Sequence, residues 1–332
     1  MQKPLFSILV YAFLVMLSTQ ISAAPLATTG LTGDWAEESV ENLKTDVIFD
    51  GTPVKISDLI AKATYDLVQI NPANPSFILA SCTAVLIDKD ILLTAAHCIP
   101  AKGLEMLIRY YSVKDKTTKT LKVVQSVAHQ QYDSVNIAGR GPTEKNDIAI
   151  LQTEKAIPGG VRALLPKADL KIPNNQKVID AGFGFNKPAA TMADAMKDPQ
   201  ILALIAKYGS NMTQQQQQEV AAKVLEIIML HPLLSTESSA SLLTDVEPDI
   251  AQMMIVNNEH PVCEGDSGGP SFLQQSSGPL VVLGIHSTST DAACKDNSAA
   301  PATNPAHGYD IYVPTYVNWI KANITKLQGQ DI

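Results

Sequence analysis

The segment Cys263–Pro270, CEGDSGGP, has the residue types and spacing best suited to covalent chemistry. Glycines on both sides of Ser267 permit a tight turn that exposes its hydroxyl and brings neighbouring backbone N–H groups together. Converging N–H donors form an oxyanion hole, which stabilises the charge that develops during acyl transfer. A glycine-flanked serine also occurs in ordinary turns, so a nucleophile is predicted only if the chain supplies a base and an acid.

Two further segments supply them. The segment Leu93–Cys98, LTAAHC, places His97 after an apolar run that begins at Val85 and predicts a strand. The segment Asn146–Leu151, NDIAIL, places Asp147 at the start of another apolar run. Imidazole titrates close enough to neutrality to take a proton from serine and return it, and a carboxylate can hold the imidazole in the useful tautomer.

These three segments, in the order His, Asp, Ser, resemble the catalytic segments of the chymotrypsin-like (trypsin-like) serine protease family. Other folds that carry the same triad order it differently along the chain. The resemblance implies that His97 is the general base, Asp147 its orienting acid and Ser267 the nucleophile. It also implies that the N–H groups of Gly265 and Ser267 form the oxyanion hole. His129, in a segment that resembles a non-catalytic part of the family, is expected to be structural.

The fold expected from the resemblance is all-β, with two packed antiparallel six-stranded β-barrels and the active site between them. Short apolar runs bounded by turn residues agree with this. The first barrel is expected over 48–151, with strands at Leu67–Ile70, Phe77–Ile87, Met106–Val113, Leu121–Val127 and Ile148–Leu151. The second is expected over 152–332, with strands at Lys177–Phe185, Met253–Val256, Leu280–His286 and Tyr309–Val313, and a C-terminal helix from Tyr316.

A helical insertion in the second barrel, over about 188–250, is the chain's main departure from the family pattern. Pro199 suits a first helical turn and Gly209 a helix end. Thr213 and Gln216 have the spacing of a capping box for a second helix. Packing against the barrel is the simpler expectation for these helices. The alternative is a lid, an exosite or a surface for an inhibitor.

The N-terminus predicts export. One charge at Lys3, the apolar run Leu5–Leu17 and the small residues near Ala23 are typical of a signal peptide over 1–23. The apolar run is too short to span a bilayer comfortably, although an uncleaved anchor is the alternative. The mature protein is thus expected to be secreted, extracellular or periplasmic, and away from membranes after signal cleavage.

Residues 24–47 are polar and are expected to form a pro-segment. The segment that starts at Ile48, IFDG, resembles the family's mature N-terminus. In that family the freed ammonium pairs with the acid before the nucleophile, here Asp266. A buried carboxylate without a partner is costly, which favours a cation beside it. The resemblance therefore implies a zymogen cleaved between Val47 and Ile48.

Four cysteines in an exported chain can pair in three ways. The resemblance selects one pairing, in which Cys82 and Cys98 close the loop that carries His97. Cys263 and Cys294 would then tie the serine segment to a later strand. Free thiols would need a reducing compartment, which the signal peptide argues against.

The composition narrows the partners. Asp and Glu number 33 against 25 Lys and Arg, a formal charge of −8, which gives no reason to expect nucleic acid or an anionic membrane as a partner. The 6 histidines are scattered without the paired spacing of zinc ligands, so neither a metal nor a cofactor is expected. The remaining expected partner is a protein or peptide substrate.

The specificity pocket gives conflicting signals. The resemblance assigns it Pro261, Val262, Glu264, His286, Ser287, Ser289 and Asp310. Pro261 and Val262 carry no charge where trypsin-like selection of Lys or Arg would need one. The segment Gly284–Ser287, GIHS, resembles bacterial glutamyl endopeptidases, where the histidine meets an acidic side chain. Asp310 would either favour a basic substrate residue or neutralise His286. These residues do not decide which substrate side chain the pocket binds, and Glu or Asp is the weakly favoured expectation.

The sequence therefore predicts a secreted serine endopeptidase that acts through an acyl-enzyme. Two alternatives belong to other classes. One is a catalytically silent binding protein on the same fold, and the other is an esterase that uses the same three residues.

Overall fold

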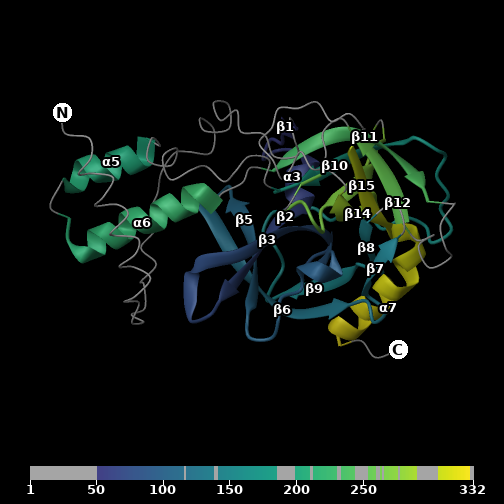
Figure 1. Cartoon of the computed structure of the whole chain (residues 1–332), viewed down its shortest axis with the longest axis horizontal. Coiled ribbons are helices and arrows are strands. Elements are labelled where there is room, and N and C mark those ends of the chain that lie inside the picture. The colour runs from purple at the N-terminus through teal and green to yellow at the C-terminus, as the bar shows by residue number, and fades with distance from the viewer. Residues whose placement is uncertain are drawn as a thin grey trace.

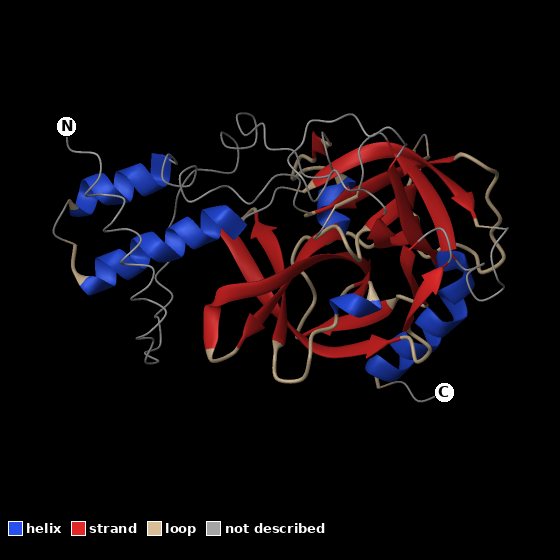
Figure 2. Ribbon diagram, in the orientation of Figure 1, coloured by secondary structure: helices blue, strands red, loops and turns tan. Residues whose placement is uncertain are grey.

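The computed structural model of the chain describes part of its length in detail. The described residues are 51–115, 117–137, 141–184, 199–209, 212–229, 233–243, 253–258, 262–263, 265–275, 277–289 and 306–329. Their β-strands form two closed barrels, and helices lie at two ends of the molecule (Figures 1 and 2). Ile48, Pro261, Glu264, Cys294 and the expected signal and pro-segments lie outside these residues.

The first barrel closes in the order β2-β3-β4-β9-β6-β5. Its strands are β2 (Thr64–Asn71), β3 (Asn74–Asp88), β4 (Ile91–Thr94), β5 (Glu105–Ser112), β6 (Thr117–Ala128) and β9 (Ala149–Thr153). Aliphatic side chains fill its interior, among them Leu67, Leu93 and Ile150, which are fully buried. A short helix, α3 (Leu59–Ala63), precedes the barrel, and a hairpin of β7 (Asp133–Ile137) and β8 (Gly141–Lys145) stands between β6 and β9.

The apolar run from Val85 to Leu93, expected to be one strand, is two. A turn at Lys89 and Asp90 separates β3 from β4, and the two strands pair antiparallel with Val85 opposite Leu93. The turn side chains are charged and the strand side chains are apolar, which is why the chain reverses there and keeps both strands in the core.

The second barrel is built from six strands in the order β11-β10-β13-β14-β15-β12, and β12 pairs back with β11 to close it. The strands are β10 (Gln176–Gly182), β11 (Leu234–Leu242), β12 (Met253–Asn258), β13 (Pro270–Leu273), β14 (Val282–Ser289) and β15 (Ala306–Tyr312). A two-residue strand, β1 (Thr52–Pro53), adds to the outer edge of β11. The expected fold class is confirmed: two six-stranded antiparallel barrels, an insertion with helices, and a C-terminal helix.

Two strands of this barrel were not predicted. β11 lies inside the range assigned to the helical insertion, so that assignment was wrong for Leu234–Leu242. β13 begins at Pro270 and was not recognised either. In both strands the residues that face inward include hydroxyl side chains, namely Thr236, Ser238 and Ser271, which are buried. An alternation of apolar and polar residues is the usual strand signal, and polar inward positions remove it.

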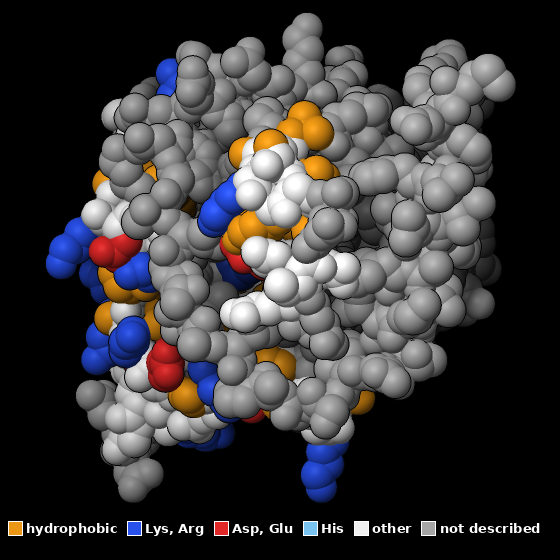
Figure 3. Space-filling view, turned by 90° about the vertical axis from the view of Figure 1, so that its left-hand side faces the viewer, with side chains coloured by type: hydrophobic (Ala, Val, Ile, Leu, Met, Phe, Trp, Pro, Cys, Tyr) orange, Lys and Arg blue, Asp and Glu red, His pale blue; other side chains and the backbone are white. Residues whose placement is uncertain are grey.

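The helices of the insertion are α5 (Pro199–Tyr208) and α6 (Gln214–Met229). The expected capping box is present: Thr213 N–H donates to Gln216 Oε1 at 2.9 Å, and Gln216 N–H donates to Thr213 Oγ1 at 3.3 Å. The two helices pack side by side and project from the first barrel, with α6 reaching β3 (Figure 1). On this end of the molecule, the apolar side chains that are described occur in small groups between polar and charged ones (Figure 3).

The C-terminal helix, α7 (Val317–Leu327), follows a single 3-10 turn, Val313–Tyr316. It leaves the second barrel and packs on the first, where Trp319 Nε1 donates to Gln130 Oε1 at 3.1 Å. Gln328 Nε2 donates to Asp88 Oδ2 at 3.2 Å. The helix therefore ties the barrels together at one side. None of the helices in the described part of the chain has the length and apolar character needed to cross a membrane.

Candidate active site

His97 lies in a short 3-10 helix, Ala96–Cys98, that follows β4 at the barrel interface. Its Nδ1 is 2.7 Å from Asp147 Oδ2, and its backbone N–H donates to Asp147 Oδ1 at 2.9 Å. Both oxygens of one carboxylate therefore hold the same histidine. The disulfide between Cys82 and Cys98, with an S–S length of 2.00 Å, anchors this turn to β3.

Asp147 is fully buried between the barrels. It follows Asn146, whose φ of 51° turns the chain sharply before β9. Asn146 is fixed on both sides, since its Nδ2 donates to Gln131 O and its Oδ1 accepts from the Tyr316 hydroxyl at 2.8 Å. Ser287 of β14 adds a third donor to Asp147, with Oγ 2.7 Å from Oδ2. Donors from both barrels thus orient this carboxylate.

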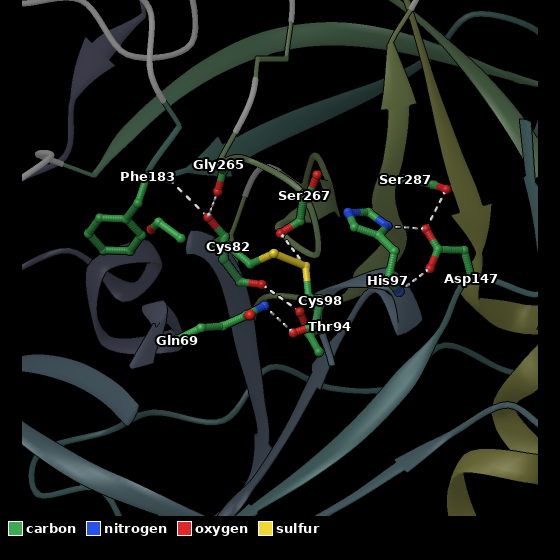
Figure 4. Close-up of a disulfide and its surroundings, with 12 residues drawn as sticks. Gln69, Cys82, Thr94, His97, Cys98, Asp147, Phe183, Gly265, Ser267 and Ser287 are labelled. Atoms are coloured by element: carbon green, nitrogen blue, oxygen red, sulfur yellow. Dashed lines mark hydrogen bonds and ion pairs between the residues drawn. A yellow bond between two sulfur atoms is a disulfide. The ribbon is translucent and has the colours of Figure 1, made fainter. Parts of the chain in front are cut away.

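Ser267 lies in the loop before β13, which the first barrel holds in place. The backbone N–H of Thr83 donates to Ser267 O at 2.8 Å, and Thr83 Oγ1 donates to Gly265 O at 3.0 Å. Ser267 O also lies 3.6 Å from Cys98 Sγ, next to His97 in the chain. Figure 4 shows the imidazole of His97 between Asp147 and Ser267. The structure therefore brings the three sequence-predicted residues into one site.

The glycines around Ser267 are required by close packing. Gly268 has a φ of 81°, and a Cβ there would lie 2.0 Å from Thr94 Oγ1. Gly265 has a φ of 96°, in the left-handed region that favours glycine. Within the described part of the chain, neither Gly265 N–H nor Ser267 N–H donates a hydrogen bond. Two backbone donors at the serine are therefore available to an acceptor from outside.

The environment of His97 balances opposing effects on its pKa. Partial burial lowers the pKa, while the hydrogen bond and charge of Asp147 and the charge of Glu144 raise it, and the net direction is upward. Glu144 belongs to β8 and accepts a hydrogen bond from the hydroxyl of Tyr132. Sequence analysis missed this carboxylate because it reaches His97 through the β7–β8 hairpin, whose pairing no sequence motif indicated.

Asp266, the expected partner of a new N-terminus, is fully buried beside the nucleophile loop. Its carboxylate accepts backbone N–H bonds from Gly184 at 2.7 Å and from Cys263 at 2.9 Å. A Cβ at Gly182 or Gly184 would collide with this carboxylate, so both positions need glycine. Burial raises the pKa of Asp266 to about 6 in spite of the two N–H donors.

A second histidine–aspartate pair lies inside the second barrel. His286 Nδ1 is 3.0 Å from Asp310 Oδ1, and both side chains are buried. Asp310 Oδ2 and Asp180 Oδ1 both lie within hydrogen-bonding distance of Ser271 Oγ. One hydroxyl has one proton to donate, so one of the two carboxyls must carry its own. Burial and the charge of Asp310 raise the pKa of Asp180, against the lowering effect of His286, which favours protonation there.

His286 itself is held as a cation. Burial lowers its pKa, but nearby carboxylates, above all Asp310 through its charge and its hydrogen bond, outweigh that effect and raise the pKa to about 9. Its Nε2 is buried and has no hydrogen-bond partner among the described residues. Of the two roles considered for Asp310, the geometry therefore gives neutralisation of His286.

The other expected pocket residues are dispersed. Val262 is buried next to Gly308, and Ser289 is exposed at the end of β14. Ser287 points to Asp147, so its hydroxyl serves the interface between the barrels. Pro261 and Glu264 fall outside the described residues. Cys263 is disulfide-bonded, and Cys294, its expected partner, also falls outside them.

His129 packs against the C-terminal helix. Its ring is 5.4 Å from that of Tyr316 in an edge-to-face contact and 5.0 Å from that of Trp319. Its Nδ1 accepts from Gln131 N–H, and burial lowers its pKa. These contacts fit the structural role expected from the sequence.

Two groups of side chains in the described residues bring three nitrogen or oxygen atoms close enough for a metal ion: His97, Glu144 and Asp147, and Asp180, His286 and Asp310. In each group the aspartate–histidine hydrogen bond already occupies the histidine Nδ1. A hydroxyl donor occupies the same aspartate as well. The donor sets are therefore used in hydrogen bonds within the protein.

Comparison with known proteins finds proteases that are similar to this chain at low identity. Rat tissue-type plasminogen activator is 24% identical over 258 residues, which is 73% of this chain and 39% of that protein. Mouse transmembrane protease serine 11C is 24% identical over 64% of this chain and 42% of its own length. Mouse cathepsin G is 27% identical over 32% of this chain and 40% of its own length. The chain thus spans about two fifths of each of these relatives.

The family model named Trypsin matches residues 68–320, which include His97, Asp147, Ser267 and all strands of both barrels except the first four residues of β2. The match covers well over half of the chain. The chain belongs to the trypsin family of serine proteases.

Proposed function

We propose that this protein is a serine endopeptidase in which His97, Asp147 and Ser267 form the catalytic triad. His97 takes the proton of Ser267 as the hydroxyl attacks a peptide carbonyl, and Asp147 stabilises the imidazolium. His97 then returns the proton to the leaving amine, and water hydrolyses the acyl-enzyme in the same way. The observation that carries the proposal is the position of the His97 imidazole, which lies between Asp147 and Ser267 and is held by Asp147 through Nδ1 and the backbone N–H (Figure 4).

The oxyanion hole in this proposal consists of the N–H groups of Gly265 and Ser267. Neither N–H group donates a hydrogen bond to another described residue. Thr83 of the first barrel holds the loop that presents them. Preorganised donors of this kind cost no rearrangement during reaction, and each contributes about 10²–10³ to the rate.

The test is covalent labelling with a fluorophosphonate probe, together with hydrolysis of a peptide library. Ser267→Ala should abolish labelling and lower kcat by about 10⁶-fold. Ser57→Ala is the control, because Ser57 is an exposed serine whose hydroxyl donates to its neighbour Asp58, and labelling at Ser267 should persist in it. Labelling that survives in Ser267→Ala would refute the assignment. Absence of labelling would favour a binding protein, and labelling with ester but no peptide hydrolysis would favour an esterase.

Activation of a zymogen is a further part of the proposal. Asp266 supports it, because a fully buried carboxylate with a raised pKa would be stabilised as an anion by the ammonium of Ile48. The signal-like segment 1–23 and the Cys82–Cys98 disulfide support export, since disulfides persist in oxidising compartments. N-terminal sequencing of the active protein should give Ile48 as the first residue. A start well away from Ile48 would contradict this.

For the primary pocket, we favour substrates with Glu or Asp. His286 supports this preference, since a buried cation with an unpartnered Nε2 offers a hydrogen bond to an acceptor such as a carboxylate. Replacement of His286 by Gln should then lower kcat/KM for acidic substrates more than for neutral ones. An equal effect on both would leave His286 a structural residue.

A further inference from the structure

Glu144 places a second carboxylate beside the imidazole of His97. It lies on β8, opposite Ser134 of β7, and the β7–β8 hairpin ends directly before Asn146 and Asp147. One oxygen of Glu144, one ring nitrogen of His97 and one oxygen of Asp147 all lie within 4.8 Å of one another. Glu144 is therefore part of the same group of side chains as His97 and Asp147.

The two carboxylates differ in their remaining capacity to bind. Asp147 is fully buried and receives three donors, two from His97 and one from Ser287. Glu144 is half-buried and, within the described part of the chain, receives one donor, the Tyr132 hydroxyl, on Oε2. No lysine, arginine or other cation forms an ion pair with it within the described part of the chain. Its Oε1 is therefore left for a donor from outside.

The charges at the site leave room for one cation. During acyl transfer His97 becomes positive and Asp147 stays negative, so the two cancel. Glu144 then gives the three side chains a net charge of about −1, in addition to the charge of the oxyanion that the backbone N–H groups bind. An incoming positive side chain would balance this charge in the transition state, where the effect raises kcat/KM.

The distance limits which substrate residue can supply that cation. The reacting carbonyl carbon lies about 3 Å from the serine oxygen at attack, and successive Cα atoms are about 3.8 Å apart. Because Glu144 is within 4.8 Å of His97, the side chain that reaches it must come from a residue close to the scissile bond.

We propose that Glu144 forms a subsite for the cationic side chain of a lysine or arginine that lies within about two residues of the scissile bond. This inference rests on the proposed peptidase function and adds a substrate feature to it. Tyr132 occupies Oε2, so a guanidinium has no bidentate advantage and both cations should be accepted at similar levels.

The experiment uses the active protein and sets of peptides that differ at a single position, with Lys, Arg or Gln placed in turn at each residue around the cleavage site. The readout is the ratio of kcat/KM for Lys over Gln, because a general loss of rate cancels in it. At one position the wild-type ratio should be at least about tenfold and should fall as salt is raised.

Glu144→Gln should bring this ratio close to one, and Glu144→Lys should bring it below one, in favour of Asp or Glu at that position. Glu154→Gln is the control, because Glu154 is an exposed glutamate beyond β9, at the end of that strand distant from Asp147. It should keep the wild-type ratio. Melting temperatures and fluorophosphonate labelling of each variant identify variants that fail to fold.

Two results would overturn the inference while the peptidase function stands: no preference for Lys at any tested position, or a preference that survives in Glu144→Gln. A change in pH dependence without a change in the ratio would also overturn it, since Glu144 would then act on His97 alone. If the wild-type protein neither labels nor cleaves peptides, the proposed function fails first.

Discussion

His97–Asp147 and His286–Asp310 are two histidine–aspartate pairs with similar internal geometry and different surroundings. The Nδ1 to carboxylate distances are 2.7 Å and 3.0 Å. Each aspartate also binds a serine hydroxyl, from Ser287 and Ser271 respectively. Each pair has a further carboxylate nearby, Glu144 for the first and Asp180 for the second. The first pair lies at the barrel interface, and the second is enclosed in a barrel.

One strand serves both pairs. His286 and Ser287 are consecutive residues of β14, and side chains in a strand alternate between its two faces. His286 therefore turns into the second barrel toward Asp310, while Ser287 turns toward Asp147 of the first barrel. The comparison teaches that the pair alone does not define a catalytic site. A catalytic pair also needs a nucleophile within reach of the imidazole. His97 has Ser267 beside it, whereas the Nε2 of His286 has no hydrogen-bond partner among the described residues.

The largest effects are expected when the aspartate of each pair is replaced by asparagine. These variants should separate a pair that acts in catalysis from a pair that stabilises the fold. Asp147→Asn should lower the rate of fluorophosphonate labelling by about 10⁴-fold with a folded protein, because the imidazole loses its useful tautomer. Asp310→Asn should change the labelling rate by less than about tenfold, but lower the free energy of unfolding by about 3–5 kcal/mol, because the buried cation of His286 loses its partner. Similar labelling losses in both variants would mean that the pairs are not distinct.

The pH dependence of stability should report on the buried pair. The fold raises the pKa of His286 from 6.5 to about 9, so its protonated form stabilises the native state. This contribution is complete below the unfolded pKa and is lost as pH rises through about 9, up to about 3 kcal/mol in total. Denaturation followed between pH 6 and pH 10 should therefore show a decline in wild type that is smaller in His286→Gln. Parallel curves would contradict a charged His286.

The smallest effect should come from the carboxylate beside each pair. In the proposed mechanism His97 acts as a base when neutral, so kcat/KM should fall as pH drops through its pKa, which lies above the ordinary 6.5. Glu144→Gln removes one of the charges that raise this pKa and should move the acid limb down by a few tenths of a pH unit. Asp180→Asn should leave the acid limb in place, because Asp180 faces His286. A shift with Asp180→Asn and none with Glu144→Gln would reverse the assignment.

The comparison also explains what the sequence could predict. The candidate triad was found because His97, Asp147 and Ser267 each sit in a local motif. The residues around the buried His286–Asp310 pair could not be found in this way. Asp180 and Ser271 are 91 residues apart in the sequence and meet only when their strands pair. β11 and β13 were missed for the same reason. Their inward residues Ser238 and Ser271 are polar because they bind Asp180, so these strands lack the alternation of apolar and polar residues that predicts a strand.

Thr83 makes the position of the serine loop depend on how the two barrels are aligned. This residue belongs to the first barrel, yet its N–H and its hydroxyl bind the carbonyls of Ser267 and Gly265, which belong to the second. A small slippage of one barrel against the other would displace the attacking oxygen from its base while every strand stayed paired. Hydrolysis should thus cease in mild denaturant before the spectroscopic signals of either barrel change. Loss of activity would then be the first measurable sign that the contact between the barrels has weakened.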